Sequence, residues 1–323
     1  MAFLAGVDEA GYGPFVGPLT LGFSLFRLAD PQADLWPALE PAAARRSARR
    51  AVRSDRRLWL DDSKIVHQGP HGRTRLERSV AAFRELCAPG RRDLEGWIGE
   101  PPCGAARLLH ASPWHAILSG PLCPSVDAGR ARLDAAALRR ALDAAGAALA
   151  GFGARAVPAN EWNRALAEHG GNKGEAHLEL TMEIVRHVLR ATGGAPLRIE
   201  LDRLGGRLRY AEKLRAALGA RSVTTHGENE GGSAYTLEIG GRAVQVRFSE
   251  GADGKHAPVA LASLAAKQTR ERLMDLHNEW FGARLPGLAP TKGYALDGRR
   301  WLREVEPRLA ELELGAEFVK RDR

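Results

Sequence analysis

The chain has 323 residues, of which 44% are hydrophobic and 27% charged, with a formal net charge of +8 at pH 7. That is enough for a sizeable core, and no apolar run approaches the roughly 20 residues that span a bilayer. Three cysteines (Cys87, Cys103 and Cys123) argue against a disulfide framework and fit a reducing compartment. We expect a cytoplasmic protein without a signal peptide. Its positive charge favours a polyanionic partner.

The chain opens with an apolar strand over residues 3–7, which delivers two adjacent carboxylates, Asp8 and Glu9, into a glycine-rich turn. Adjacent acids beside a buried strand repel each other and resist desolvation, and a cation between them removes both problems. Ligation by oxygen alone suits magnesium or manganese. A solvated surface turn is the alternative interpretation. A dinucleotide-binding loop fits less well, because the glycines at 11, 13 and 17 are spaced one residue too far apart.

Alternate apolar positions over residues 19–26 predict a second strand, so that the first two strands form a hairpin. Apolar periodicity and turn residues predict the later elements. They are a strand at 58–60, helices at 73–87 and 131–149, a strand at 155–157, helices at 161–168 and 175–192, a strand at 197–202, a helix ending near 218, a strand at 222–225, a hairpin over 234–248, a helix at 259–280 and a last helical region kinked at Pro307.

Strands that alternate with helices after an initial hairpin predict an α/β fold with a mixed sheet. We expect one domain, 1–323, with insertions near 30–56, 88–130 and 226–258. The first of these is rich in Ala, Arg and Pro, and we expect it to be exposed and partly helical.

Three separated places could supply carboxylate ligands to a metal: Asp8 with Glu9, Asp202 at the end of an apolar strand, and Glu271 within an apolar and basic helix. Each alone has an ordinary explanation, such as a helix cap or a solvated turn. It is their order along the chain and the sequence around each of them that favour a metal site.

In this order and context the chain resembles the type 2 ribonucleases H, the ribonuclease HII family. The resemblance spans nearly the whole chain and rests on five motifs in the family's order. They are DEAGYGPFVGP at residues 8–18, Asp62-Ser63-Lys64, Asp202 at a strand end, ALASLAAKQTRE at residues 260–271, and Lys292-Gly293-Tyr294. It implies a ribonuclease H-like fold with a mixed central sheet, flanking helices and a C-terminal helical region.

The resemblance implies that the acids Asp8, Glu9, Asp202 and Glu271 hold two divalent cations, Mg²⁺ or Mn²⁺. One cation would activate a water molecule and the other would stabilise the leaving oxygen. The implied reaction is endonucleolytic cleavage of the RNA strand of RNA–DNA hybrids, or at ribonucleotides embedded in duplex DNA. The products would carry a 5′-phosphate and a 3′-hydroxyl.

The resemblance also implies a substrate-binding set. Ser63 and Lys64 would contact phosphates, the backbone around Tyr12 would approach the ribose 2′-hydroxyl, and Tyr294 would stack on a sugar or a base. The complete set is Gly11, Tyr12, Gly13, Ser63, Lys64, Lys267, Lys292 and Tyr294.

The chain departs from the family at three motif positions. Tyr12 stands where the family has Arg, Glu271 where Asp is usual, and Thr291 where His is common. These departures leave two alternatives open: a catalytically weakened nucleic-acid-binding relative, and a metal-dependent enzyme for a different nucleic acid such as branched DNA. We expect a monomer. The extra N-terminal domain of the sister family, ribonuclease HIII, is not expected here.

Two further groups of residues could bind ligands. Cys103, His110, His115 and Cys123 match no common zinc-finger spacing, and we interpret them as coincidence. His226 and His256 flank the predicted hairpin; each is either a proton shuttle, a phosphate contact or a solvated loop residue.

Overall fold

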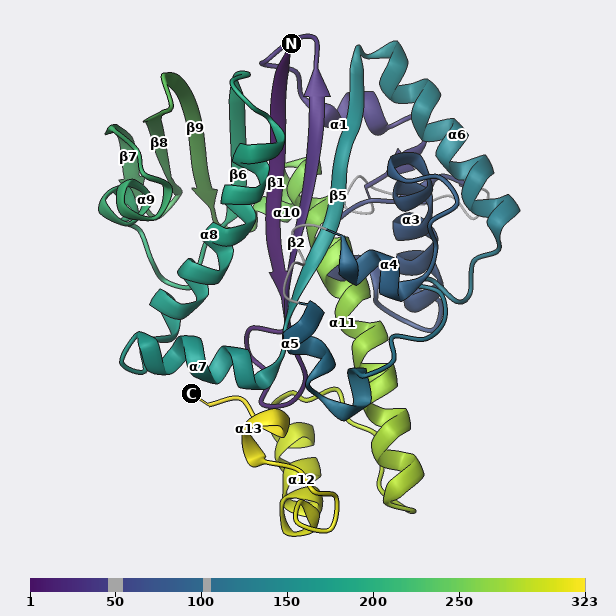
Figure 1. Ribbon diagram of the computed structural model, residues 1–323. Coiled ribbons are helices and arrows are strands. Elements are labelled where there is room, and N and C mark those ends of the chain that lie inside the picture. The colour runs from purple at the N-terminus through teal and green to yellow at the C-terminus, as the bar shows by residue number, and fades with distance from the viewer. Residues whose placement is uncertain (46–54, 101–105, 323) are drawn as a thin grey trace.

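The computed structural model of the protein describes residues 1–45, 55–100 and 106–322. A seven-stranded sheet of order β5-β2-β1-β6-β9-β8-β7 lies at its centre (Figure 1). Its strands are β1 (Ala2–Ala10), β2 (Leu19–Leu28), β5 (Ala147–Val157), β6 (Leu197–Asp202), β7 (Ser222–Asn229), β8 (Gly232–Ile239) and β9 (Arg242–Ser249). The β1–β6 and β6–β9 pairs are parallel and the others antiparallel. The expected α/β class and the mixed sheet that opens on a hairpin are confirmed.

Helices cover both faces of the sheet (Figure 1). The helices α7 (Ala159–Glu168), α8 (Lys173–Ala191) and α9 (Ala211–Leu218) lie on one face. The other face carries α11 (Ala257–Arg284) with α1 (Leu35–Leu39), α3 (Gly72–Cys87), α4 (Leu94–Gly99) and α6 (Ala128–Ala144). The short elements are β3 (Ala43–Ala44), β4 (Leu58–Trp59), α2 (Ser63–Val66), α5 (Ala106–His110), η1 (Pro113–His115) and α10 (Ala252–Lys255).

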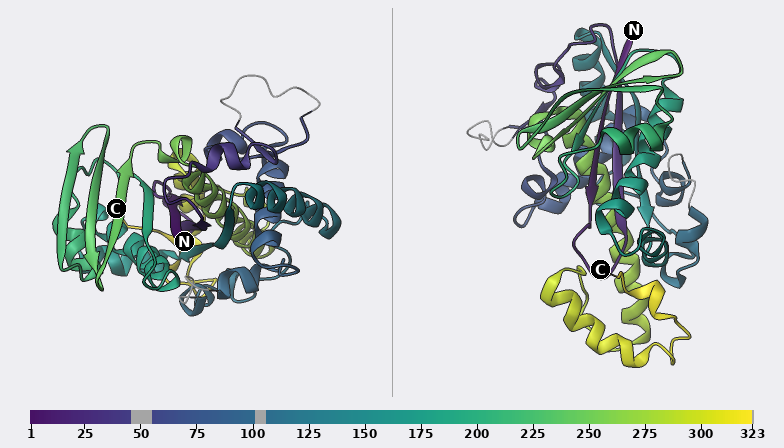
Figure 2. Two further views of the ribbon diagram at one scale, coloured as in Figure 1. Left: turned by 90° about the horizontal axis from the view of Figure 1, so that it is seen from above. Right: turned by 90° about the vertical axis from the view of Figure 1, so that its left-hand side faces the viewer.

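The expected C-terminal helical region is present as α12 (Ala295–Val305), η2 (Glu306–Arg308) and α13 (Ala316–Val319). It lies at one end of the molecule, below the sheet in Figure 1 and in the right-hand view of Figure 2. Across the residues described, none of the helices combines the length and apolar character needed to cross a membrane.

Helix α11 lies unusually close to the first hairpin because glycines replace side chains at the contact. A Cβ atom at Gly6 of β1 would lie 2.1 Å from the Pro258 carbonyl carbon, and one at Gly22 of β2 would lie 2.0 Å from the Ala262 carbonyl oxygen. The small residues of the 260–271 motif form the matching surface of the helix. This contact fixes α11 against the strand that carries Asp8.

Successive side chains of a strand point to opposite faces of its sheet. Leu4 belongs to the apolar cluster on the α11 face, and Ala5 and Val7 belong to the cluster on the α8 face. Asp8 therefore points toward α11, and Glu9 points toward α8.

The predicted helix over 131–149 is wrong at its C-terminal end. The helix stops at Ala144, and residues 147–157 form the long strand β5, where only 155–157 were expected. Alanine-rich sequence suggested a helix, but β5 fits beside β2 because of its glycines. A Cβ atom at Gly153 would lie 2.8 Å from the Phe23 ring.

The segments predicted as insertions contribute to the folded core. Leu35 and Leu39 of α1 are buried, so residues 30–45 are not simply an exposed loop. Trp97 of α4 is buried with them in the apolar cluster on the α11 face of the sheet. Residues 222–249 supply three strands of the sheet. Their status as insertions, and the single domain, stay predictions.

Candidate active site

Three aspartates lie near one another at the C-terminal ends of β1 and β6, next to the first turns of α11. Asp8 is 8% exposed and is hydrogen-bonded to Ser263 of α11. Asp202 ends β6 and accepts a hydrogen bond of 2.9 Å from the backbone N–H of Ala252 in α10. Asp253 is the next residue of α10, so the same turn that holds Asp202 brings in a third carboxylate.

Glu9 reaches the same end of the sheet from the opposite face. Its side chain is 21% exposed, and its Oε2 lies 3.8 Å from Nε2 of His177 on α8. The imidazole of His177 stacks on the Tyr12 ring, with 4.6 Å between ring centroids. Tyr12 also packs edge-on against Trp162. Its side chain therefore packs against the protein instead of extending into solvent.

Burial and mutual repulsion disfavour ionisation of these acids. Burial, then the charges of Glu9 and Asp202, raise the pKa of Asp8 well above its usual range. Burial and Asp202 raise the pKa of Glu9 to about 7. Burial and the neighbouring charges of Asp62 and Asp202 raise the pKa of Asp253 to about 6. Burial also raises the pKa of Asp202.

An ammonium group lies beside these acids. Lys64 is the residue after Ser63 in α2, and its pKa is raised first by Asp62 and then by Asp253, Asp8 and Asp202. A single ammonium group cannot neutralise four carboxylates. We refer to Asp8, Glu9, Asp202 and Asp253 as the acid cluster.

The donor set of the acid cluster suits a hard divalent cation, because every ligand atom it offers is a carboxylate oxygen. Within the residues that the structure describes, however, no three His, Cys, Asp or Glu side chains converge closely enough to hold a metal ion. The opposite directions of Asp8 and Glu9 along an extended strand, and their repulsion, account for this.

Ser63 lies beneath the surface at this site and not on it. It is 6% exposed, and its hydroxyl is hydrogen-bonded to the hydroxyl of Ser263 at 2.9 Å. Since Ser263 in turn contacts Asp8, Ser63 supports the position of an acid. Its expected contact with a substrate phosphate is not supported by this burial.

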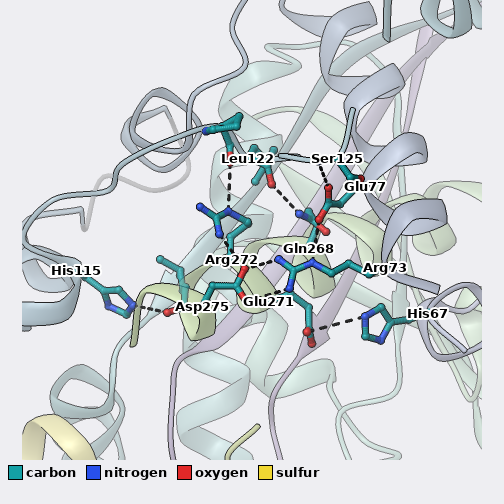
Figure 3. A network of polar contacts seen from close by, with 12 residues as sticks. His67, Arg73, Glu77, His115, Leu122, Ser125, Gln268, Glu271, Arg272 and Asp275 are labelled. Atoms are coloured by element: carbon teal, nitrogen blue, oxygen red, sulfur yellow. Dashed lines mark hydrogen bonds and ion pairs between the residues drawn. The ribbon is translucent and has the colours of Figure 1, made fainter. Parts of the chain in front are cut away.

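The structure does not bring Glu271 to the acid cluster. Glu271 lies eight residues beyond Ser263 on α11, which corresponds to about 12 Å along the helix. Its Oε1 pairs with Nζ of Lys267 at 2.7 Å. Its Oε2 lies 3.9 Å from Nε2 of His67, as Figure 3 shows. Burial opposes ionisation of Glu271, but Lys267 and His67 outweigh it and lower its pKa.

The two glycine-containing loops expected to contact substrate lie against each other. The backbone N–H of Phe15 donates to Gly293 O at 2.9 Å. Gly293 has φ +81, and a Cβ atom there would lie 2.2 Å from Val16 O. Arg270 connects the loops by donating to Val16 O and Lys292 O at 3.2 and 2.9 Å. Loops from opposite ends of the sequence thus form one surface.

Beside this surface is a cavity of about 560 Å³. Tyr294, 40% exposed, is at its edge, with the Arg270 guanidinium 4.9 Å from the ring centroid. Lys292 is exposed, and Gly13 has open space beside it. The cavity is lined by Arg73, Arg270, Glu271, Met274, Asp275, Asn278, Pro290, Thr291, Lys292, Tyr294 and Asp297.

The other histidines and cysteines form no ligand group among the described residues. Cys103 lies outside them, and Cys123 is buried as a free thiol. His115 is buried with its Nε2 3.0 Å from Leu273 O. His226 lies 2.8 Å from the Thr236 hydroxyl, and His256 lies 3.7 Å from Glu200. These contacts fit structural roles.

Asp253 was not anticipated from the sequence. It lies in the stretch Gly251-Ala-Asp-Gly-Lys255, which looked like part of a loop inside an insertion. Its position could have indicated a role. Asp253 lies in the short segment between β9, which pairs with the Asp202 strand β6, and the small-residue helix α11.

Comparisons with known proteins give structural matches only. No family model and no curated protein matches the sequence. A ribonuclease HII from Archaeoglobus fulgidus, solved as a PCNA complex, matches over 99% of this chain and 94% of its own at 17% identity and TM-score 0.43. The ribonuclease H2 of Pyrococcus horikoshii matches over 98% and 92%, at 16% identity and TM-score 0.41.

A third match is Bst-RNase HIII in complex with Mn²⁺, which covers 99% of this chain and 66% of the other at 14% identity and TM-score 0.41. These are type 2 ribonucleases H, the family that the five sequence motifs resemble. At identities of 14–17% and TM-scores of 0.41–0.43 the similarity assigns no activity to this chain.

Proposed function

We propose that the protein is a metal-dependent endonuclease that cleaves the RNA strand of RNA–DNA hybrids, or ribonucleotides embedded in duplex DNA. One observation carries the proposal: four carboxylates from three separate segments lie near the end of the central strands and raise one another's pKa values, with Lys64 beside them. Groups with strongly perturbed pKa values mark functional sites more often than structural ones.

In this proposal Asp8, Glu9, Asp202 and Asp253 hold Mg²⁺ or Mn²⁺, and Glu271 does not. Two bound cations would supply an activated water and stabilisation of the leaving oxygen. To bind the same cation as the three aspartates, the Glu9 side chain has to rotate from the α8 face toward the end of β1. Its partial exposure permits this rotation. Ser263 and the Ala252 N–H hold Asp8 and Asp202 in place for it.

The substrate strand is proposed to run from the acid cluster toward Tyr294. Lys64, Lys267 and Lys292 would contact phosphates along this path, and Tyr294 would stack on a sugar or base. Glu271 lies among these lysines and would orient Lys267 and His67 by its ion pairs. The net charge of +8 favours the same polyanionic partner.

The backbone at Gly11–Gly13 is proposed to approach the ribose. Gly11 has φ +87, and a Cβ atom there would lie 2.5 Å from Nε of Arg270, so that only glycine fits. Gly13 is open to solvent. Contact with a 2′-hydroxyl is the feature that separates RNA from DNA.

The test is cleavage of three labelled duplexes in Mg²⁺ or Mn²⁺: a continuous RNA–DNA hybrid, DNA with one embedded ribonucleotide, and plain DNA. We expect metal-dependent cutting of at least one RNA-containing duplex, no cutting of plain DNA, and loss of cutting in Asp8→Asn. Comparing the two RNA-containing duplexes also shows what Tyr12 does to junction preference.

A catalytically weakened nucleic-acid-binding protein is the second candidate. It is favoured by the divergence of the cluster's side chains, which form no ready metal site among the described residues. Tight hybrid binding without cutting in either metal would establish it and would contradict the nuclease. A monomer located in the cytoplasm completes the proposal, and light scattering tests the oligomeric state.

A further inference from the structure

The last residues of the chain contact the loop that follows Asp8 and Glu9. Arg321 is 2% exposed, and its guanidinium Nη2 donates to the backbone oxygens of both Gly11 and Pro14. These two carbonyls flank Tyr12 and Gly13, the positions proposed to approach the ribose. A buried guanidinium that bonds two carbonyls of one loop restrains the path of that loop.

Backbone contacts strengthen this connection. The N–H of Arg321 donates to Phe15 O at 2.8 Å, and Lys320 forms a β-bridge with Val16. Residues 320–322, which we call the C-terminal strap, therefore run alongside the loop for several residues. The bond from Arg321 to Gly11 joins residues 310 positions apart in the chain.

The C-terminal strap is also fixed on its other side. Trp162 Nε1 of α7 donates to Asp322 O at 3.1 Å. Asn163 donates to Lys320 O at 2.9 Å and accepts from the Asp322 N–H at 2.8 Å. Helix α7 thus holds the strap by hydrogen bonds, and the strap in turn holds the loop.

The loop touches the acid cluster only indirectly, through Tyr12 and His177. Tyr12, between the two carbonyls that Arg321 binds, stacks on His177, which faces Glu9 at 3.8 Å. Displacement of the loop would move Tyr12, whereas Glu9 remains fixed in β1 opposite Leu21 of β2. Asp8, Asp202 and Asp253 are held by β6, α10 and α11 and have no contact with the strap among the interactions described.

We propose that Arg321 is a positioning residue that holds the Gly11–Gly13 backbone where it distinguishes ribose from deoxyribose. The inference rests on the proposed function, and it assigns a specificity role to the C-terminal strap. Arg321 touches neither substrate nor metal. Its loss should weaken binding of RNA-containing duplex and lower ribose discrimination, with little change in the rate at saturating substrate.

The experiment compares Arg321→Gln with Arg308→Gln, a matched loss of an exposed arginine that pairs with Glu311 in the same C-terminal region. We expect Arg321→Gln to raise KM for the preferred RNA-containing duplex about tenfold, the loss expected for hydrogen bonds to a charged group. kcat should stay within about threefold, and Arg308→Gln should match the wild type.

A second readout needs no turnover. In Ca²⁺ and in an Asp8→Asn background, fluorescence anisotropy gives the affinity for the RNA-containing duplex relative to plain DNA. This ratio should fall about tenfold when Arg321→Gln is added to that background. Calorimetry on Arg321→Gln alone, with Asp8 intact, should give the Mn²⁺ affinity of the wild type. Arg321→Lys, which retains one donor, should give an intermediate ratio.

If Arg321→Gln fails to fold, Trp162→Phe decides, since it removes the indole hydrogen bond to the strap, keeps an aromatic ring beside Tyr12 and should lower the ratio in the same direction. Ratios equal to the wild type in the variants that fold would overturn the inference. Failure of the wild type to cut any duplex would instead overturn the proposed function, and the two failures are therefore distinguishable.

Discussion

Two regions along α11 are rich in carboxylates, and their electrostatics are opposite. At the N-terminal end, the acid cluster lies beside Lys64, and the pKa values of its members are nevertheless raised. Around the middle of the helix, the acids have basic partners, several of which Figure 3 shows. Glu271 pairs with Lys267, Asp275 with Arg73 and Arg272, and Glu77 with Arg73.

The difference separates two uses of the same residue type. Paired carboxylates fix the positions of arginine and lysine side chains and need no further charge. Carboxylates gathered without enough partners raise the free energy of the folded state until a cation joins them. The position of a carboxylate in a helix or a motif does not reveal whether it is paired with a base or available to bind a cation. Its neighbours in space do.

The largest expected effect is on cleavage. Asp202→Asn should lower kcat/KM by about a thousandfold or more, because a lost metal ligand removes several kcal/mol of stabilisation from the transition state. Glu100→Gln removes a carboxylate that is paired with Arg84 and Arg91, and its activity per folded molecule should stay within about threefold of wild type. Equal losses in both variants would erase the distinction between paired and unpaired carboxylates.

Glu271→Gln should act on substrate binding and not on catalysis. Without its partner, Lys267 is less well oriented toward a phosphate, so KM for a hybrid should rise about threefold to tenfold while kcat changes little. Steady-state kinetics on one RNA-containing duplex measures both. A loss of kcat as large as that of Asp202→Asn would return Glu271 to the catalytic group.

The acid cluster should make the metal-free protein less stable as pH rises. The pKa of Glu9 is raised from 4.5 to about 7 in the folded state, so between these values the folded protein binds more protons than the unfolded chain. The free energy of unfolding therefore falls as pH increases through this window.

In EDTA, the Tm of the wild type relative to Glu9→Gln should drop by about 2–5 °C from pH 5 to pH 8. Added Mn²⁺ should cancel the drop. Differential scanning fluorimetry of the two proteins measures it, and a relative Tm that rises with pH would contradict the assigned pKa shift.

The smallest effect is expected in the paired region. Arg73→Gln removes ion pairs to Glu77, which is 1% exposed, and to Asp275. Because Arg73 itself is 41% exposed, solvent screens part of the interaction, and we expect a loss of about 1–2 kcal/mol in stability. Urea unfolding measures this loss. Mn²⁺ affinity should not change, and a change would couple the two regions.

Much of the acid cluster followed from the sequence, for a simple geometrical reason. Asp8, Glu9 and Asp202 stand at the ends of apolar strands, and neighbouring parallel strands such as β1 and β6 end at the same edge of a sheet. The mixed sheet and its opening hairpin were predicted for a similar reason, since alternation of apolar residues is a local property.

What the sequence did not reveal depends on contacts between distant segments. Asp253 joins the acid cluster because α10 turns back over Asp202, and nothing local marks that turn. β5 became a strand because its glycines fit against Phe23 of β2. Arg321 reaches Gly11 only through the packing of the C-terminal strap on α7.

Calorimetric titration of Mn²⁺ into the wild type, Asp253→Asn and Glu271→Gln tests the central claim most directly. The account predicts that Asp253→Asn binds at least about tenfold more weakly than the wild type, and that Glu271→Gln binds equally well. Wild-type affinity in Asp253→Asn together with weakened binding in Glu271→Gln would contradict it, and would place the metal ligands where the sequence motif, and not the fold, puts them.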